Sequence, residues 1–195
     1  MNTPAHAILN LLILGNQKQE ENNLAIVLGA ILPDLPMFIF YLWEKFIRGT
    51  SEKLIWSVHY FHSSWQAFFD IFNSLPLIII GGVVSYYRGA MGFIAFFASM
   101  FLHALGDLPL HHNDGHHHFF PFSNWRFDSP VSYWDPRHYG NIVAPLEAIA
   151  VLAGCFILLR RHTSIPARVI IGIVVALYVI YWGYALVTWG YSSEQ

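Results

Sequence analysis

The sequence is poor in charge, and this shortage excludes most classes of soluble protein. Only 11% of its 195 residues are Asp, Glu, Lys or Arg, whereas a typical soluble domain has roughly 25%. The formal net charge is −2 and the longest basic run is Arg160-Arg161, so a nucleic-acid partner is not expected. The single cysteine, Cys155, excludes an internal disulfide. Because 55% of the residues are hydrophobic, the composition indicates an integral membrane protein in contact with the lipid bilayer.

Five apolar segments approach the roughly 20 residues that a membrane-spanning helix needs. They are Leu24–Trp43, Phe68–Tyr87, Ala90–Leu110, Ile142–Leu159 and Ala167–Gly190. Prolines interrupt the first segment at Pro33 and Pro36, and Pro76 lies inside the second, where we expect a kink or a break of the helix. The sequence therefore predicts a single all-α domain over residues 1–195, a polytopic membrane helix bundle of about five spans.

Two further helices are expected beside the spans. A short N-terminal helix has Thr3 as its predicted cap and Pro4 at its first position, and it should end before Gly15. An amphipathic helix over Leu54–Leu75 carries a polar stripe whose members step by three and four, namely His59, His62, Gln66, Asp70 and Asn73. In so apolar a chain, this stripe is expected to face a wet cavity inside the bundle.

The segment His111–Asn141 is predicted to form a long structured loop. It has no helical period, and it is dense in Phe, Trp, Tyr, Pro and His. Ordered segments of this length are more often functional than not. The positive-inside rule places the loop with Arg160, Arg161 and Arg168 in the cytoplasm. The segment His111–Asn141 is then an outer loop, and we expect it to cover a site.

Eleven histidines stand out in this apolar chain, and some of them combine with carboxylates into a candidate metal site. Asp34 lies between two prolines in an apolar run, where a carboxylate is costly and functional by default. His103 and Asp107 are four residues apart, on one face of a helix. Adding two imidazoles gives the predicted ligands His6, Asp34, His62, His103 and Asp107. For each, the alternative is a structural hydrogen bond.

This ligand set contains only nitrogen and oxygen donors, and it can hold one ion or two neighbouring ions. Such donors suit zinc first, with manganese or iron as alternatives. A divalent metal that lowers the pKa of bound water supplies hydroxide near neutral pH, which favours hydrolysis. The predicted catalytic residues are Asp34, His62 and Asp107. The predicted substrate-binding residues are Arg126, whose guanidinium suits phosphate, together with His111 and His138.

Several short motifs, in this order, resemble the LexA-binding, inner-membrane-associated family of metal-dependent hydrolases. They are Thr3-Pro-Ala-His6 with Asn10, Gly29-Ala-Ile-Leu-Pro-Asp34, Phe61-His62-Ser63, His103-Ala-Leu-Gly-Asp107 and Pro121-Phe-Ser-Asn-Trp-Arg-Phe. The resemblance implies a helical bundle in the bacterial inner (plasma) membrane with the same five metal ligands. A more distant similarity to zinc-dependent phospholipase C implies phosphodiesterase-like chemistry on a phospholipid or another phosphoester.

Three other functions stay open from the sequence. A membrane di-iron oxidase would use the histidines of His111–His118 as a histidine box, although His59–His62 is a poor second box and no third is evident. A metal transporter or sensor would use the same loop as a metal trap, although transporters tend to have internal repeats. A structural membrane protein would use its histidines only to line a wet cavity.

Overall fold

The protein is all-helical. The computed structural model describes residues 1–16, 21–161 and 165–192, and this part contains helices and turns but no strand. The α-helices are α1 (Thr3–Leu14), α2 (Glu21–Ile31), α3 (Leu35–Leu42), α4 (Glu52–Leu54), α5 (Ser63–Asn73), α6 (Leu75–Tyr87), α7 (Met91–Asp107), α8 (Gly140–Arg161) and α9 (Ile165–Ser192). Short 3-10 or π-helical turns adjoin them, namely η1 (Leu32–Asp34), η2 (Trp43–Ile47), η3 (Ile55–His59), η4 (Leu108–Leu110) and η5 (Pro136–His138).

Four helical stretches are long and apolar enough to cross a membrane. They are Asn22–Ile47, Ser63–Tyr87, Met91–Leu110 and Gly140–Arg161, and they contain or largely overlap four of the predicted spans. The fifth predicted span lies on α9, where Ala167–Gly183 is a shorter apolar stretch. The side chains of residues 184–190 lie outside those that the structure describes, so the fifth span stays a prediction.

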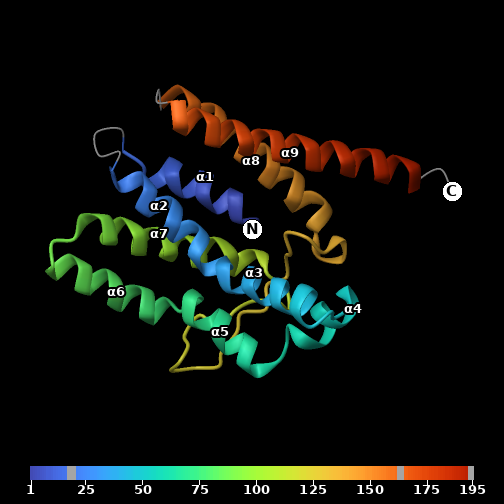
Figure 1. Ribbon diagram of the computed structural model, residues 1–195, viewed down its shortest axis with the longest axis horizontal. Coiled ribbons are helices and arrows are strands. Elements are labelled where there is room, and N and C mark those ends of the chain that lie inside the picture. The colour runs from blue at the N-terminus through green and yellow to red at the C-terminus, as the bar shows by residue number, and fades with distance from the viewer. Residues whose placement is uncertain (17–20, 162–164, 193–195) are drawn as a thin grey trace.

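Helix α1 lies inside the bundle, between the α2–α7 pair and α8 (Figure 1). On one side, α2 packs against α7 and α7 against α6. On the other side, α8 packs against α1, and α9 covers α8. The residues Ala5, Ile8, Val151 and Cys155 belong to the apolar core between α1 and α8. This packing holds the N-terminal end of α1 against the C-terminal half of α7.

Both predicted helix breaks are confirmed. At the first, the chain passes from α2 through η1 into α3, and the carbonyl of Pro33 accepts a hydrogen bond from Asn73 Nδ2 at 3.2 Å. At the second, α5 ends at Asn73 and α6 starts with Pro76 in its first turn, where Ser74 caps the backbone N–H of Leu77. Side chains thus satisfy backbone groups at both breaks.

The N-terminal helix is confirmed, but its predicted cap is wrong. Helix α1 ends at Leu14, before Gly15, and has proline in its first turn as expected. Thr3 is already helical, Asn2 occupies the N-cap position, and no side chain caps the helix. The Thr3 hydroxyl instead donates a hydrogen bond to Asp34, because packing brings the start of α1 against η1.

The predicted amphipathic helix over Leu54–Leu75 is wrong. After the π-helical turn η3, the chain turns through Tyr60 and Phe61, and α5 starts anew at Ser63. Gln66 Nε2 donates to the carbonyl of Tyr60 at 2.7 Å, which satisfies the backbone at the break. Tyr60 itself packs into an aromatic core with Phe40 and Phe69, so core packing overrides the helical period.

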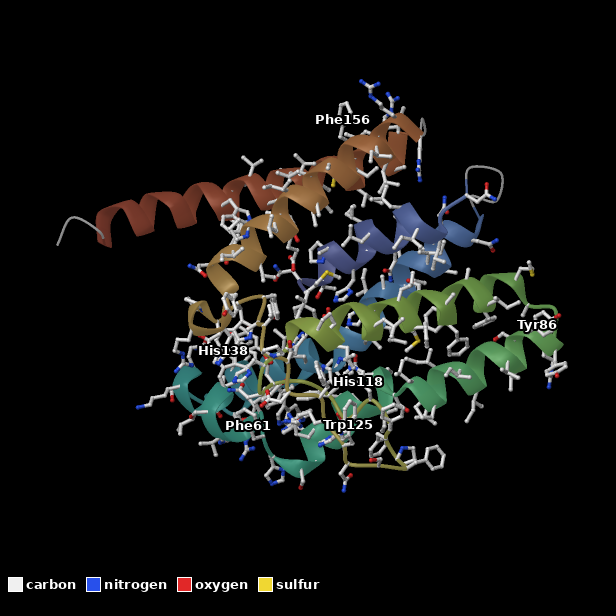
Figure 2. The ribbon with its side chains drawn as sticks, turned by 180° about the vertical axis from the view of Figure 1, so that it is seen from behind. Phe61, Tyr86, His118, Trp125, His138 and Phe156 are labelled. Carbon is white, nitrogen blue, oxygen red and sulfur yellow. The ribbon has the colours of Figure 1, made fainter. Side chains whose placement is uncertain are left out.

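The predicted loop is an ordered segment that packs against the ends of α5 and α7 (Figure 2). His118 accepts a backbone hydrogen bond from Leu75 at 2.9 Å, and the hydroxyl of Ser74 donates to the carbonyl of Phe120. Asp70 of α5 accepts from the backbone N–H and the ring of His117 at 2.9 and 2.6 Å. The segment is thereby fixed beside the break between α5 and α6.

Candidate metal centre

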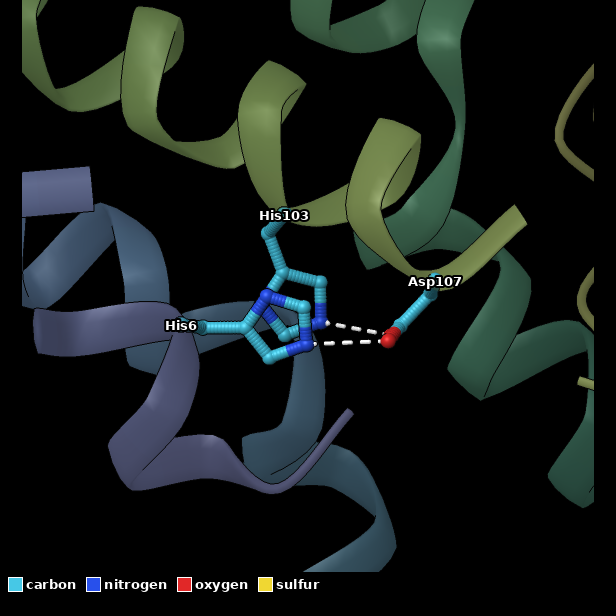
Figure 3. A group of neighbouring side chains, drawn as sticks. All are labelled: His6, His103 and Asp107. Atoms are coloured by element: carbon cyan, nitrogen blue, oxygen red, sulfur yellow. Dashed lines mark hydrogen bonds and ion pairs between the residues drawn. The ribbon is translucent and has the colours of Figure 1, made fainter. Parts of the chain in front are cut away.

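Three of the predicted ligands meet inside the bundle, and we call them the triad: His6 of α1 with His103 and Asp107 of α7 (Figure 3). Asp107 Oδ1 lies 2.9 Å from His6 Nε2, and Asp107 Oδ2 lies 3.1 Å from His103 Nε2. One potential ligand atom from each residue lies within 4.8 Å of the other two. The triad is therefore a candidate metal site of two imidazoles and one carboxylate.

The triad is closed to solvent. Both histidines are 0% exposed and Asp107 is 2% exposed. The two rings stack with their centroids 3.6 Å apart and their planes 16° from parallel. An ionised carboxylate this deeply buried is costly unless a positive charge or several hydrogen bonds stabilise it, so Asp107 needs cationic partners.

The tautomer of His103 follows from its backbone contact. His103 Nδ1 lies 2.7 Å from the carbonyl oxygen of Ala30, which can only accept, so Nδ1 carries a proton. In the neutral ring, Nε2 then has no proton and carries a lone pair that can only accept. This lone pair faces the carboxylates of Asp107 at 3.1 Å and Asp34 at 3.5 Å, and Nε2 has no hydrogen-bond partner within the described part of the chain.

An acceptor that faces two carboxylates is repelled unless a proton or a cation stands between them. A metal ligand of this kind ordinarily donates its other ring N–H to a backbone carbonyl or a carboxylate, as His103 does to Ala30. The position of Nε2 between these oxygens thus fits either a divalent cation or a second proton on His103, which would pair with both carboxylates. His6 Nδ1 is also buried with no hydrogen-bond partner among the described residues.

Asp34, the fourth predicted ligand, lies beside the triad. Its Oδ1 faces His103 and its Oδ2 accepts the hydrogen bond from Thr3. Asp107 has two more neighbours, the Met1 amino nitrogen and His111 Nε2, the latter 3.4 Å from Oδ1. Carboxylates and imidazoles from four parts of the chain therefore gather at one point.

The fifth predicted ligand, His62, is not brought to this point. It is exposed at the N-cap position of α5, and its Nδ1 lies 2.8 Å from the hydroxyl of Ser64. The break before α5 separates it from the stripe with which it was grouped. Two other members of that stripe make structural hydrogen bonds. Asp70 accepts from the ring of His117, and Asn73 donates to the carbonyl of Pro33.

A cavity of about 730 Å³ lies next to the triad, a volume typical of small-molecule sites. Its polar wall includes Asp34, His111, Asp114 and His116. Its remaining wall is largely apolar and aromatic, with Met37, Phe38, Trp56, Phe61 and Phe69 among its members. His6, His103 and Asp107 are not part of the lining, so Asp34 stands between the triad and the cavity.

His111, a predicted substrate contact, lines this cavity between two carboxylates. Its Nε2 faces Asp107, and its Nδ1 lies 3.2 Å from Asp114 Oδ1. Burial lowers the pKa of the His111 imidazole, but the charge of Asp107 and the contact with Asp114 outweigh it and raise the pKa to about 9. Burial lowers the pKa of the neighbouring His116 to about 4.

The other predicted substrate contacts do not line the cavity. Arg126 is half-buried and donates to Gln66 Oε1 at 2.7 Å, with a longer contact of 3.5 Å to the carbonyl of Asn113, a cavity residue. His138 stacks on His112 with the ring centroids 3.6 Å apart, and it lies 3.1 Å from Asp135. The structure thus places Arg126 behind the cavity wall and His138 elsewhere on the loop.

Several residues of this region were not singled out from the sequence. Thr3, predicted only as a helix cap, donates to Asp34, and the carbonyl of Ala30 accepts from His103; both contacts arise from packing between distant segments. Asp114 and His116 lie in the histidine-rich run that the sequence indicated as a histidine box or as a metal trap. The density of histidine between residues 111 and 118 was the signal for them.

Comparison with protein-family models finds no match, and neither does comparison with curated proteins or with solved structures.

Proposed function

We propose that this protein is a membrane-embedded, metal-dependent hydrolase that cleaves phosphoesters of amphiphilic molecules, with phospholipids as the first substrates to test. The observation that carries the proposal is the buried triad with the unpartnered Nε2 of His103 turned toward two carboxylates. The motif resemblance to membrane-bound metal-dependent hydrolases supports the same activity and a bacterial inner membrane as its location.

The ligands in this proposal are His6, His103 and Asp107, with Asp34 beside them, while His62 is left out because it lies apart. Two imidazoles and a carboxylate suit zinc first, and manganese or iron next. When bound, such an ion lowers the pKa of a water ligand toward 7 and so supplies hydroxide near neutral pH.

Asp34 is the proposed proton acceptor for the attacking water. It lines the cavity, and it is held on its other side by the Thr3 hydroxyl. A carboxylate fixed in this way can orient a water molecule and take its proton, which is general-base catalysis. Asp107 has a different role, because its two oxygens contact the two imidazoles of the triad and orient both rings.

The cavity favours a substrate with a phosphate group and an apolar part. None of the described residues that line it is Lys or Arg, whereas Asp34 and Asp114 are acidic. A phosphate therefore needs positive charge at this wall, either from a bound cation or from the protonated imidazole of His111, whose pKa is raised to about 9. Arg126, in contact with Asn113, is the candidate for additional positive charge. Phe38, Trp56 and Phe61 offer an apolar wall for hydrocarbon chains.

The proposal is tested with detergent-purified protein loaded with zinc or manganese. We expect hydrolysis of a chromogenic phosphodiester or of phospholipid in mixed micelles. Activity should be lost on treatment with a chelator and restored by the metal. The double variant His103→Ala/Asp107→Ala should lose both the activity and the metal, as measured by elemental mass spectrometry.

The matched control is His62→Gln, which removes an exposed imidazole outside the triad. It should retain the metal and the activity. Metal-loaded protein that hydrolyses none of these esters contradicts the hydrolase proposal and leaves a metal-binding membrane protein. Hydrolysis that persists in His103→Ala/Asp107→Ala contradicts the assignment of the triad.

A further inference from the structure

A second set of ligand-type side chains lies on the loop that follows α7. It consists of His111, Asp114 and His116, and we call it the cavity set. All three line the cavity described above. His116 is 8% exposed, and the side chains of His111 and Asp114 are 13% and 17% exposed. The set is therefore largely desolvated, yet it borders an open volume.

The cavity set has buried polar atoms without hydrogen-bond partners. Within the described chain, no hydrogen bond is made by either ring nitrogen of His111, by Nδ1 of His116 or by Oδ1 of Asp114. Leaving such a buried group unsatisfied is destabilising, and native proteins leave few of them. Several unsatisfied atoms on one cavity wall indicate a ligand that these atoms share.

The chemistry of these atoms points to a cation. Two imidazoles and a carboxylate are the donor types of zinc and manganese sites. His111 Nδ1 lies 3.2 Å from Asp114 Oδ1, and the His111 and His116 rings have their centroids 6.2 Å apart. The set is wider than the triad, and it lies on the segment that follows α7 and η4.

Asp107 connects the cavity set to the triad. Its Oδ1 lies 2.9 Å from His6 Nε2 and 3.4 Å from His111 Nε2. A carboxylate between two groups of imidazoles is suited to neutralise two neighbouring cations. The two sites differ in access, because the triad histidines are fully buried and the cavity set faces the open volume. A site that borders an open volume leaves a coordination position for a substrate oxygen.

We propose that His111, Asp114 and His116 bind a second divalent cation next to the triad, with Asp107 shared between the two sites, and that this cavity-facing ion contacts the phosphate of the substrate. The inference rests on the proposed function, which it deepens. The triad would keep the water-activating role given above, and Asp107 would link the two sites. A protonated His111 between Asp107 and Asp114 is the competing explanation of the same contacts.

The test is the number of ions bound by the detergent-purified full chain, measured by elemental mass spectrometry after saturation with zinc and removal of the excess. We expect two ions in the natural protein. Asp114→Asn/His116→Gln should bind one ion, and His138→Gln, a control on the same loop outside the cavity lining, should bind two. With manganese, the electron paramagnetic resonance spectrum of the natural protein should be that of two coupled ions.

The outcomes separate this inference from the proposed function. The natural protein could bind one ion that Asp114→Asn/His116→Gln retains and His6→Gln/His103→Gln loses. This result overturns the second site and supports the protonated His111. It leaves the triad as the metal site. No ion in the natural protein overturns both proposals. Manganese spectra of isolated ions in the natural protein also overturn the second site, and they do not depend on the folding of any variant.

Discussion

Gly29 offers a test of the metal centre that alters none of its side chains. Helix α2 approaches α7 so closely here that a Cβ atom built on Gly29 would lie 2.2 Å from the carbonyl oxygen of Phe96 and 3.0 Å from Ser99 Cβ. The next residue, Ala30, provides the carbonyl that fixes His103. The substitution Gly29→Ala therefore pushes α2 away from α7 at the point where His103 is oriented.

The magnitude follows from these distances. Real Cβ contacts stay above 3.0 Å, so the helices must separate by about 0.8 Å, an overpacking that costs roughly 1–3 kcal/mol. The same shift lengthens the contact of His103 Nδ1 with Ala30 from 2.7 Å toward the limit of a hydrogen bond, about 3.5 Å. Loss of such a supporting hydrogen bond typically lowers metal affinity by about 10–100-fold.

The assay is zinc affinity by competition with a chromophoric chelator, with thermal unfolding in detergent measured in parallel. The control is Gly172→Ala on α9, where an added Cβ meets no described atom within 4 Å. This control should leave the zinc affinity unchanged. If Gly29→Ala is destabilised but binds zinc as tightly as the natural protein, the hydrogen bond from His103 to Ala30 does not support a metal ligand, and the reasoning is refuted.

Three more substitutions probe the same account. Asn10→Ala removes two buried hydrogen bonds of 2.9 Å to Ser99. The free energy of unfolding, measured by thermal unfolding, should fall by about 1–3 kcal/mol. The metal content should stay unchanged as long as α1 packs against α7. Thr3→Val removes the hydroxyl that holds Asp34; kcat should fall with the metal retained, and unchanged kcat would exclude Asp34 as the positioned base. Phe38→Ala trims the apolar cavity wall; kcat/KM should fall for phospholipid and not for a small soluble phosphodiester, whereas equal effects would argue against a hydrocarbon site.

Local rules in the sequence predicted much of the architecture. The prolines at 33, 36 and 76 placed two helix breaks, because proline lacks the N–H that a helix needs. The four-residue spacing of His103 and Asp107 placed both on one face of α7. Asp34 stood out because a carboxylate in an apolar run needs a specific partner. Each of these signals comes from residues close together in the chain.

The remainder of the site depends on packing between distant segments. His6 and Asp107 are 101 positions apart, and no local pattern states that α1 lies inside the bundle against α7. The assignment of His62 relied on a helical period that the aromatic core around Tyr60 interrupts. The cavity set lies on a loop without a repeating period, so its convergence could not be read from spacing.

The central claim is that a metal ion lies between His6, His103 and Asp107. The most direct test is a crystal structure of the purified, metal-saturated protein with anomalous diffraction data collected on both sides of the absorption edge of the bound metal. We predict an anomalous peak in contact with Nε2 of both histidines and with the Asp107 carboxylate. A map with no such peak, in which these side chains contact only one another and their protein neighbours, would contradict the claim and identify the cluster as structural.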